Sequence, residues 1–550
     1  MNTPELEQAA PRAAERPSDA ARAQQKAARS PGPGRFGMML VLLGLFACVL
    51  RLPGLNRPIV GDEQTTVTLA GEPVARLLRD LVAYDAHPPL YPLIMIGWAS
   101  VSHTFGAPAA IGWLRALSLI CVDGSILLMV ALVRRVFGEA IAWSAGIFAA
   151  CSPLLVFLSQ YARPYALGIL IGTVAVTCAV RWLESAPGKG KAWLAGVAIS
   201  LAALLYTFYL SIFIVAGIGL AGLAAAWLTR RSEVGWWVLA VVVGSIAWLP
   251  WLPAYGEQMR SVAAGSSSST PLLKSAGMGA YVGGVQVGAL AKPVLALWQM
   301  DDPRVLTTRL SVHLRDWRLI ALGLAGLAAT ALAFWAGALA LARRERVRGA
   351  AVLAVTLTVL PILGAAVFSL CGDLGLRAPV AVNVRYFGDS ALWMTVIAAA
   401  ALSVIRNRWV ARGLLILAIG GMLAQLPRLY RYPFQDQRAM LGLLSQTGVT
   451  AVASLPETSA TLLDGAGRAQ FQSRYREWVL TSGQTAGIAD EAAQHEQIAL
   501  IERTTAERIA GGNGLVRSFE GQLERRGFQK VEEKRISDML MIRIYRRAAS

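Results

Sequence analysis

The chain has 550 residues, of which 55% are hydrophobic and only 16% are charged. Soluble domains carry about 25% charged residues, so this composition excludes an ordinary soluble protein and indicates a membrane protein. The net charge of +18 does not indicate a nucleic-acid partner, because the cytoplasmic loops of membrane proteins collect Lys and Arg.

Residues 1–35 are rich in Ala, Arg, Gln, Pro and Ser and have no sustained apolar face, which predicts a disordered cytoplasmic tail. Long apolar runs follow. Runs of about 18 or more apolar residues with few charges predict transmembrane helices. Eleven runs are candidate spans: 37–52, 111–133, 140–158, 165–183, 192–207, 209–228, 235–253, 318–342, 350–371, 388–405 and 412–427.

Clusters of Lys and Arg orient these spans, because cytoplasmic loops carry an excess of positive charge. If the N-terminus is cytoplasmic, the eleven spans place every cluster in the cytoplasm. One apolar run, 87–105, is left out of the count, since a span there would move all five clusters to the other side. We expect it to form a helix lying on the outer membrane face. The clusters are at 134–135, 189–191, 230–231, 343–348 and 406–412.

This orientation divides residues 36–427, the predicted transmembrane catalytic domain, into spans and three outer loops, 53–110, 254–317 and 372–387. The segment 428–550 has a different composition, since 31 of its 123 residues are charged, about the proportion of a soluble domain. Within it, "TAVASL", "QIALIE" and "DMLMIRIYR" predict strands, and "FEGQLERRGF" predicts a helix ending at Gly527. We therefore predict a polytopic α-helical membrane protein with outer juxtamembrane helices and a small soluble C-terminal α/β domain.

The common energy-coupling and hydrolase motifs are missing from the sequence. It contains no G-x-x-x-x-G-K-[ST] loop and no G-x-G-x-x-G after a strand, which argues against an ATP-driven pump or a dinucleotide enzyme. It also lacks a nucleophile elbow and an H-E-x-x-H pair. An enzyme of this kind would need an activated substrate that reaches it through the membrane.

The stretch "GDEQTT" places Asp62 and Glu63 just after the first span. Adjacent carboxylates repel each other and raise the pKa of one of them, which suits a general base. The alternative is a helix N-cap, because acids favour the first turn of a helix. Both readings are compatible, since a base must be held still.

The stretch "YDAHPPLYP" places Asp85 and His87 before two prolines that fix the backbone. With Asp62 and Glu63 they would form a polar cluster in one loop that supports the acceptor. A divalent cation bound by Asp62, Glu63 and His87 is an alternative that the spacing does not demand.

Two stretches at the outer ends of spans offer groups for a phosphate. "LSQYARPYAL" contains Arg163 and Tyr165, and "NVRYFGDSALW" contains Arg385 and Tyr386. Arginine binds phosphate with two parallel hydrogen bonds. The alternatives are an interfacial anchor for Arg163 and an i,i+4 pair with Asp389 for Arg385. In the second outer loop, Lys292 is a weaker phosphate candidate.

The order of these motifs resembles a known family. An acidic pair after the first span, an "HPPLY" run, an "ARPY" after the third span and an "RY" opening a late span are similar to the polyprenyl-phosphate-sugar glycosyltransferases of GT-C fold. The nearest groups are bacterial relatives of protein O-mannosyltransferases and of the lipid A aminoarabinose transferase. The resemblance covers about residues 37–427.

The resemblance implies a bacterial inner-membrane enzyme that acts on the periplasmic face and inverts the sugar's anomeric centre. It implies Asp62 as the base with Glu63 beside it, a periplasmic C-terminal domain, and a sugar on undecaprenyl phosphate or a similar carrier as donor. Two features depart from the family. Residues 159–167 lack the acidic metal ligand of some members, and Ala86-His87 replaces the Glu-Lys of the aminoarabinose transferases.

The acceptor stays open between a lipid, a glycan and a protein. Two other classes of protein were weighed. A transporter or lipid-linked sugar flippase should carry ionisable groups inside its spans, and here Asp123 and Arg115 are the main examples and suggest one polar patch. A non-catalytic assembly protein would be expected to lack the outer acids.

Overall fold

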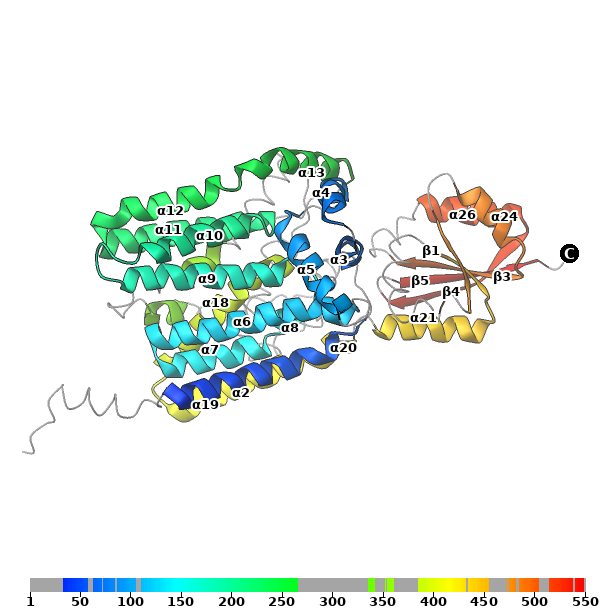
Figure 1. Cartoon of the computed structure of the whole chain (residues 1–550). Helices are drawn as coiled ribbons and strands as arrows, with labels where there is room; N and C mark the ends of the chain where they lie inside the picture. The colour runs from blue at the N-terminus through cyan, green and yellow to red at the C-terminus, as the bar shows by residue number, and fades with distance from the viewer. Residues whose placement is uncertain are drawn as a thin grey trace, which may run out of the picture.

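The computed structural model of this chain describes residues 33–57, 63–71, 73–84, 87–104, 110–265, 335–341, 352, 354–360, 384–431, 434–454, 471, 474–480, 484–503, 514–537 and 540–548. It consists of a bundle of long helices, a group of short helices at one end of the bundle, and a small α/β unit beyond that end (Figure 1). Three residues singled out in the sequence, Asp62, Asp85 and Lys292, lie outside the described residues, as do the predicted tail and most of the loop 254–317.

The long helices follow the predicted spans. Within the described residues, six helices are long and apolar enough to cross a membrane, and a bent pair, α7 and α8, makes a seventh. The predicted count of eleven is not confirmed, because α10 and α19 have only 15 and 16 residues and two predicted spans lie largely outside the described part. The bundle helices are α2 (Pro33–Arg51), α6 (Ile111–Phe137), α7 (Glu139–Cys151), α8 (Pro153–Ser159), α9 (Tyr165–Glu184), α10 (Lys191–Leu205), α11 (Ile212–Thr229), α12 (Val234–Ile246), α18 (Gly388–Val404) and α19 (Arg408–Leu423).

The bend of 61° between α7 and α8 has a local cause. Pro153 opens α8 and cannot donate a backbone hydrogen bond to the preceding turn. Ser152 then caps the new helix, since its hydroxyl accepts a hydrogen bond from the Leu155 amide at 3.4 Å. The bend redirects the chain toward the segment 160–164 at the end of the bundle.

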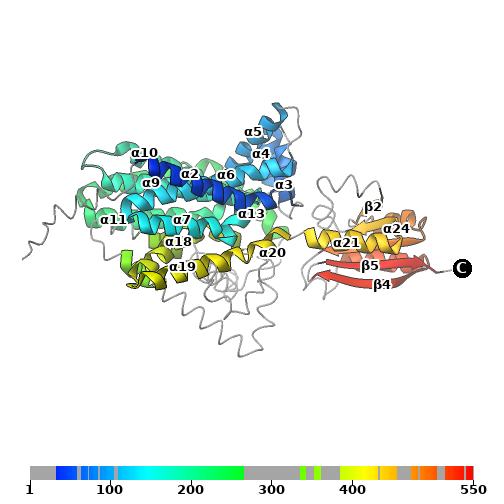
Figure 2. The same cartoon turned by 90° about the horizontal axis from the view of Figure 1, so that it is seen from below.

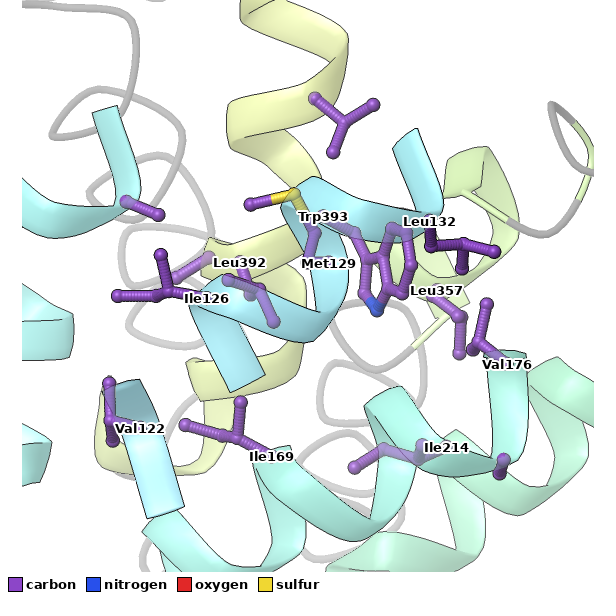
Figure 3. Packing of buried hydrophobic residues seen from close by; sticks show 14 of the residues in the cluster. Val122, Ile126, Met129, Leu132, Ile169, Val176, Ile214, Leu357, Leu392 and Trp393 are labelled. Atoms are coloured by element: carbon purple, nitrogen blue, oxygen red, sulfur yellow. The ribbon is translucent and has the colours of Figure 1, made fainter. Parts of the chain in front are cut away.

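The core of the bundle lies between α6, α9, α11 and α18, and Figure 3 shows their side chains interdigitating. Helices that are apolar on all sides are expected to be buried or to contact lipid. The outer helices α2 and α12 expose large apolar side chains, among them Val41, Leu45 and Val242, as a lipid-facing surface would. Buried side chains of the core include Val122, Ile126, Met129, Ile169, Val176, Ile214, Leu357, Leu392 and Trp393.

The described basic clusters gather at one end of the bundle. Arg135, at the end of α6, pairs with Glu184 at 2.6 Å, and the Gly188 amide donates to Glu233 at 2.7 Å. These contacts bring the turns after α6, α9 and α11 together. The turn between α18 and α19, which carries the cluster 406–412, lies at the same end (Figures 1 and 2). This arrangement agrees with the alternating orientation predicted from charge.

Three short helices occupy the opposite end: α3 (Glu63–Ala70), α4 (Val74–Tyr84) and α5 (Leu90–Thr104). Helix α5 runs across the ends of the long helices, as expected for a run that does not span (Figures 1 and 2). Its position is fixed on α6 by two indoles. Trp98 and Trp113 stack with centroids 4.5 Å apart, and each donates to the other's carbonyl oxygen, at 2.7 and 2.9 Å.

The α/β unit has a five-stranded sheet of order β2-β1-β3-β5-β4. Strands β2 and β3 pair parallel with β1, whereas β5 pairs antiparallel with β3 and β4. Helix α21 (Phe434–Thr447) packs on one face, and α24 (Thr485–Ala492) and α26 (Gly514–Arg525) pack on the other. The strands are β1 (Ala451–Ser454), β2 (Arg476–Val479), β3 (Gln497–Arg503), β4 (Phe528–Ser537) and β5 (Leu540–Arg547).

Three of these strands, β1, β3 and β5, coincide with the predicted ones, while β2 and β4 were not predicted. Gly527 ends α26 with a positive φ of 82°, as expected for a helix C-terminus. On the α26 face, Arg543 pairs with Glu502 at 2.8 Å, and the two side chains are 11% and 1% exposed. This buried pair joins β5 to β3.

Candidate functional site

The end of the bundle near α3 is organised by a buried ion pair. Glu63 opens α3, and both of its carboxylate oxygens accept hydrogen bonds from Arg115 of α6, at 2.9 and 2.6 Å. The Ala162 amide donates to the same carboxylate at 2.8 Å. Arg115 also donates to the carbonyl oxygens of Leu55 and Arg57, at 2.8 and 2.5 Å. Glu63 and Arg115 are fully buried, so this pair locks the chain after the first span to α6.

The ionisation of Glu63 follows from these partners. Burial alone would raise its pKa, but the charge and hydrogen bonds of Arg115, with smaller contributions from Arg57 and the Ala162 amide, hold the pKa below its usual value. Glu63 is therefore an ionised anchor whose oxygens are already bonded. It fixes the backbone at Ala162, immediately before Arg163.

Arg163 is 3% exposed and points at the "HPPL" segment. One terminal nitrogen lies 2.8 Å from Nδ1 of His87, and the other donates to the Thr66 hydroxyl at 3.4 Å. A guanidinium has no acceptor, so Nδ1 of His87 must accept and the ring proton resides on Nε2. That nitrogen faces the Tyr165 hydroxyl at 3.5 Å. The contacts join α3, the segment after α4, and the start of α9.

Arg385 completes the cluster from η7 (Val384–Phe387), the turn before α18. It donates to the Tyr161 hydroxyl at 3.0 Å. Its guanidinium carbon lies 5.9 Å from the ring centre of Tyr161 and 5.5 Å from those of Tyr165 and Tyr386. Aromatic faces stabilise a nearby cation, so three tyrosines hold this guanidinium in place. Arg385 and Tyr386 are half-buried and form the more open side of the cluster.

The structure brings six of the predicted site residues to one end of the bundle: Glu63, His87, Arg163, Tyr165, Arg385 and Tyr386. The other three, Asp62, Asp85 and Lys292, lie outside the described residues. The sequence reasoning missed Thr66 and the role of Arg115. An arginine inside an apolar run signals a buried partner, but the sequence does not say which one.

The polar groups inside the bundle do not form the single patch that the sequence suggested. Asp123 pairs with Arg51 of α2 at 3.1 Å, whereas Arg115 pairs with Glu63. Two turns of α6 separate these pairs, and each binds α6 to a different element. Asp389 lies one turn deeper than Arg385 and is buried against α9, where a Cβ at Gly172 would come within 2.5 Å of its oxygen.

Glu63 and His87, the two described residues of the alternative metal site, do not fit a metal ion. Both oxygens of Glu63 are bonded to Arg115, and Nδ1 of His87 faces the Arg163 guanidinium, which would repel a cation. Among the described residues, no group of three His, Cys, Asp or Glu side chains is placed to hold a metal ion.

A small pocket opens beside Arg163, with about 260 Å³ of empty space when its open side is included. Its walls are mostly apolar, whereas Thr66 and His87 provide a polar corner. These two side chains also contact Arg163, which does not itself line the pocket. It is lined by Thr66, Leu69, Ala70, His87, Tyr91, Pro92, Met95 and Pro164.

No protein-family model matches the sequence, and no curated protein matches it. The structure is similar to the archaeal oligosaccharyltransferase AglB from Archaeoglobus fulgidus in complex with an inhibitory peptide and a dolichol-phosphate. The match has 12% identity and a TM-score of 0.46, over 89% of this chain and 71% of that one. It is also similar to ArnT from Cupriavidus metallidurans bound to undecaprenyl phosphate, with 12% identity and a TM-score of 0.46, over 93% and 98% of the two chains.

A further structure of the Archaeoglobus fulgidus oligosaccharyltransferase, in complex with Zn and sulfate, matches with 13% identity and a TM-score of 0.46 over 89% of this chain and 71% of that one.

Proposed function

We propose that this protein is a glycosyltransferase that moves a sugar from a polyprenyl-phosphate carrier to an acceptor. The observation that carries the proposal is a cluster at one end of the bundle, beside the helix that follows Asp62. In it, Arg385 lies against the rings of Tyr161, Tyr165 and Tyr386. Arg163 contacts His87, which faces the Tyr165 hydroxyl. Two guanidinium groups suit a phosphate that gains charge as it leaves.

In the proposed reaction, Asp62 takes the proton from the acceptor's hydroxyl or amine. The acceptor oxygen or nitrogen forms a bond to the anomeric carbon, while the bond from that carbon to the phosphate oxygen breaks. A single displacement of this kind inverts the anomeric centre. The two bonding electrons leave with the phosphate, whose charge Arg163 and Arg385 stabilise, and Lys292 is a further candidate phosphate contact.

The two adjacent acids have different roles in this proposal. Glu63 holds α3 and the Ala162 backbone through its buried bonds, so Asp62, its neighbour, is the acid left for proton transfer. Asp85 supports the acceptor side of the same loop, and His87 contacts Arg163. We place the reaction on the periplasmic face of a bacterial inner membrane, opposite the gathered basic clusters, with the α/β unit on the reacting side.

The test uses the full-length protein purified with native lipids. Native mass spectrometry should find a co-purified polyprenyl-phosphate sugar, which then serves as donor in a transfer assay. Asp62→Asn should reduce transfer by about 10²–10⁴-fold while the donor still binds. Arg385→Ala should weaken donor binding.

Glu63→Gln, which removes the neighbouring charge, is the matched control for Asp62→Asn. Glu63→Gln should lower the amount of folded protein, whereas the transfer rate per folded molecule should stay close to that of the wild type. Full transfer by the Asp62→Asn variant would remove Asp62 from the base role. Lipid-linked sugar crossing the membrane without transfer would favour a flippase.

A further inference from the structure

The main chain of the "HPPL" segment forms hydrogen bonds with residues that do not belong to α3, α4 or α5. The His87 carbonyl oxygen accepts a hydrogen bond from Nε2 of Gln258 at 3.1 Å, and the Leu90 amide donates to the Tyr206 carbonyl oxygen at 3.0 Å. Between these points, Pro88 and Pro89 are buried and restrict the backbone. The position of the His87 ring is therefore set by elements that lie far away in the sequence.

Gln258 lies on α13 (Leu252–Gly265) and is only 1% exposed. Its Nε2 donates to the Leu81 carbonyl oxygen at 3.0 Å as well as to His87, which uses both amide protons. Its Oε1 accepts a hydrogen bond from the Tyr209 hydroxyl, and that hydroxyl accepts one from Trp251 at 3.0 Å. A tyrosine hydroxyl has one proton to donate, so this order fixes which end of the amide faces His87.

Aromatic packing stabilises the hydrogen-bonded chain of Trp251, Tyr209 and Gln258. The rings of Tyr209 and Tyr255 lie 4.7 Å apart in an edge-to-face arrangement, and Trp248 lies 5.6 Å from Tyr255. Such pairs stabilise a fixed geometry. Replacing one member of a buried hydrogen-bond network leaves the remaining partners unsatisfied. The α13 segment is thus a rigid support for one main-chain oxygen of the "HPPL" segment.

We infer that Gln258 is a positioning residue for the proposed phosphate site. It holds the His87 backbone, the His87 ring orients the Arg163 guanidinium, and Arg163 meets the donor phosphate. This inference rests on the proposed function, because it assumes that Arg163 binds the phosphate. The hydrogen bonds of Gln258 described above go to Leu81, His87 and Tyr209, and the bond to His87 links it to the site.

The experiment measures binding of undecaprenyl phosphate to the full-length protein in nanodiscs by native mass spectrometry. Gln258→Leu should weaken binding by about tenfold to a hundredfold, the range that corresponds to leaving a buried hydrogen-bond partner unsatisfied. Tyr209→Phe, which removes only the hydroxyl that orients the amide, should have a smaller effect in the same direction. This milder variant still tests the inference if Gln258→Leu does not fold.

Gln425→Leu is the matched control, because Gln425 is also a buried glutamine and bonds to the Gly421 carbonyl oxygen at 3.2 Å. Its binding should be unchanged. In the double variant Gln258→Leu/Arg163→Ala, binding should be no weaker than in Arg163→Ala alone, because both changes remove the same contact. A simple loss of stability would instead add to the effect of Arg163→Ala.

The outcomes separate the inference from the proposed function. Normal binding by Gln258→Leu together with weak binding by Arg163→Ala overturns the positioning role and leaves the phosphate site standing. Additive losses in the double variant overturn the route through Arg163. Normal binding by Arg163→Ala overturns the phosphate site itself.

Discussion

At the scale of residues, the adjacent acids Asp62 and Glu63 differ in what holds them. Glu63 is bonded to Arg115 and to the Ala162 amide inside the protein. Breaking a buried ion pair by removing one partner costs about 3–5 kcal/mol, because the other charge stays buried and unpaired. The fold at the site end therefore depends on Glu63 being ionised.

This dependence predicts how stability changes with pH. The pKa of Glu63 is lower in the folded protein than in the unfolded chain, where it is about 4.3. Its contribution is then fully present above the unfolded value and is lost as the pH falls through the folded value. Thermal unfolding of the wild type and Glu63→Gln should differ by a constant amount from pH 8 to about pH 5.5.

Below about pH 4 the difference between the two proteins should shrink, because protonation removes the same charge from the wild type. Glu139→Gln is the control, since Glu139 forms a half-exposed pair with Arg134 at 2.9 Å and should shift stability by less than about 1 kcal/mol. A gap between wild type and Glu63→Gln that stays constant down to pH 3 would contradict the assignment.

The sequence grouped the candidate residues on one side of the membrane but did not predict their contacts. The positions of the Lys and Arg clusters indicated which loops lie on the same side of the membrane. That assignment was enough to select His87, Arg163, Tyr165 and Arg385. It could not pair Glu63 with Arg115, because 52 residues separate them and no local pattern links them. Packing of α3 on α6 decides that pair.

At the scale of elements, β4 of the α/β unit shows why a strand can be missed. Its sequence "FQKVEEKRIS" is rich in charge and lacks a clear apolar alternation. It is the edge strand next to β5, so much of it faces solvent, and charges on an edge also prevent pairing with other chains. By contrast, β1, β3 and β5 have continuous buried runs that the sequence reveals directly.

The Glu502–Arg543 pair should decide the stability of this unit. Arg543→Met leaves Glu502, which is 1% exposed, without its cation, and we expect a loss of about 3–5 kcal/mol. Hydrogen exchange of β3 and β5 in the full-length protein measures the change. The double variant Glu502→Gln/Arg543→Met should recover most of the protection, and a double variant as labile as the single one would contradict this account.

At the scale of the whole molecule, the two ends of the bundle differ in chemistry. One end gathers the described basic clusters, and the other holds α3, α4, α5 and the arginine–tyrosine cluster, with the α/β unit beyond it (Figure 1). Reporter fusions after residues 136 and 188 should therefore give cytoplasmic signals, because both points lie at the basic end.

A fusion after residue 427 should give a periplasmic signal and is the matched comparison, because it follows the last predicted span and precedes the α/β unit. Periplasmic signals from the fusions after residues 136 and 188 would show that the run 87–105 spans the membrane, against the crosswise position of α5. The four described basic clusters lie at one end of the bundle (Figures 1 and 2), as the charge pattern led us to expect. The exact number of spans depends on helix lengths, which the apolar runs define poorly.

The attachment of α5 has a mechanical consequence. Rotating this helix away from the bundle would unstack Trp98 from Trp113 and break their two hydrogen bonds, together with the one from the Leu90 amide to Tyr206. Each such bond contributes about 1 kcal/mol. We therefore expect helix α5 to move together with α6 as one rigid body and not to open as a hinged lid. If the proposed lipid-linked donor reaches the site from the bilayer, a segment other than α5 has to move to admit it.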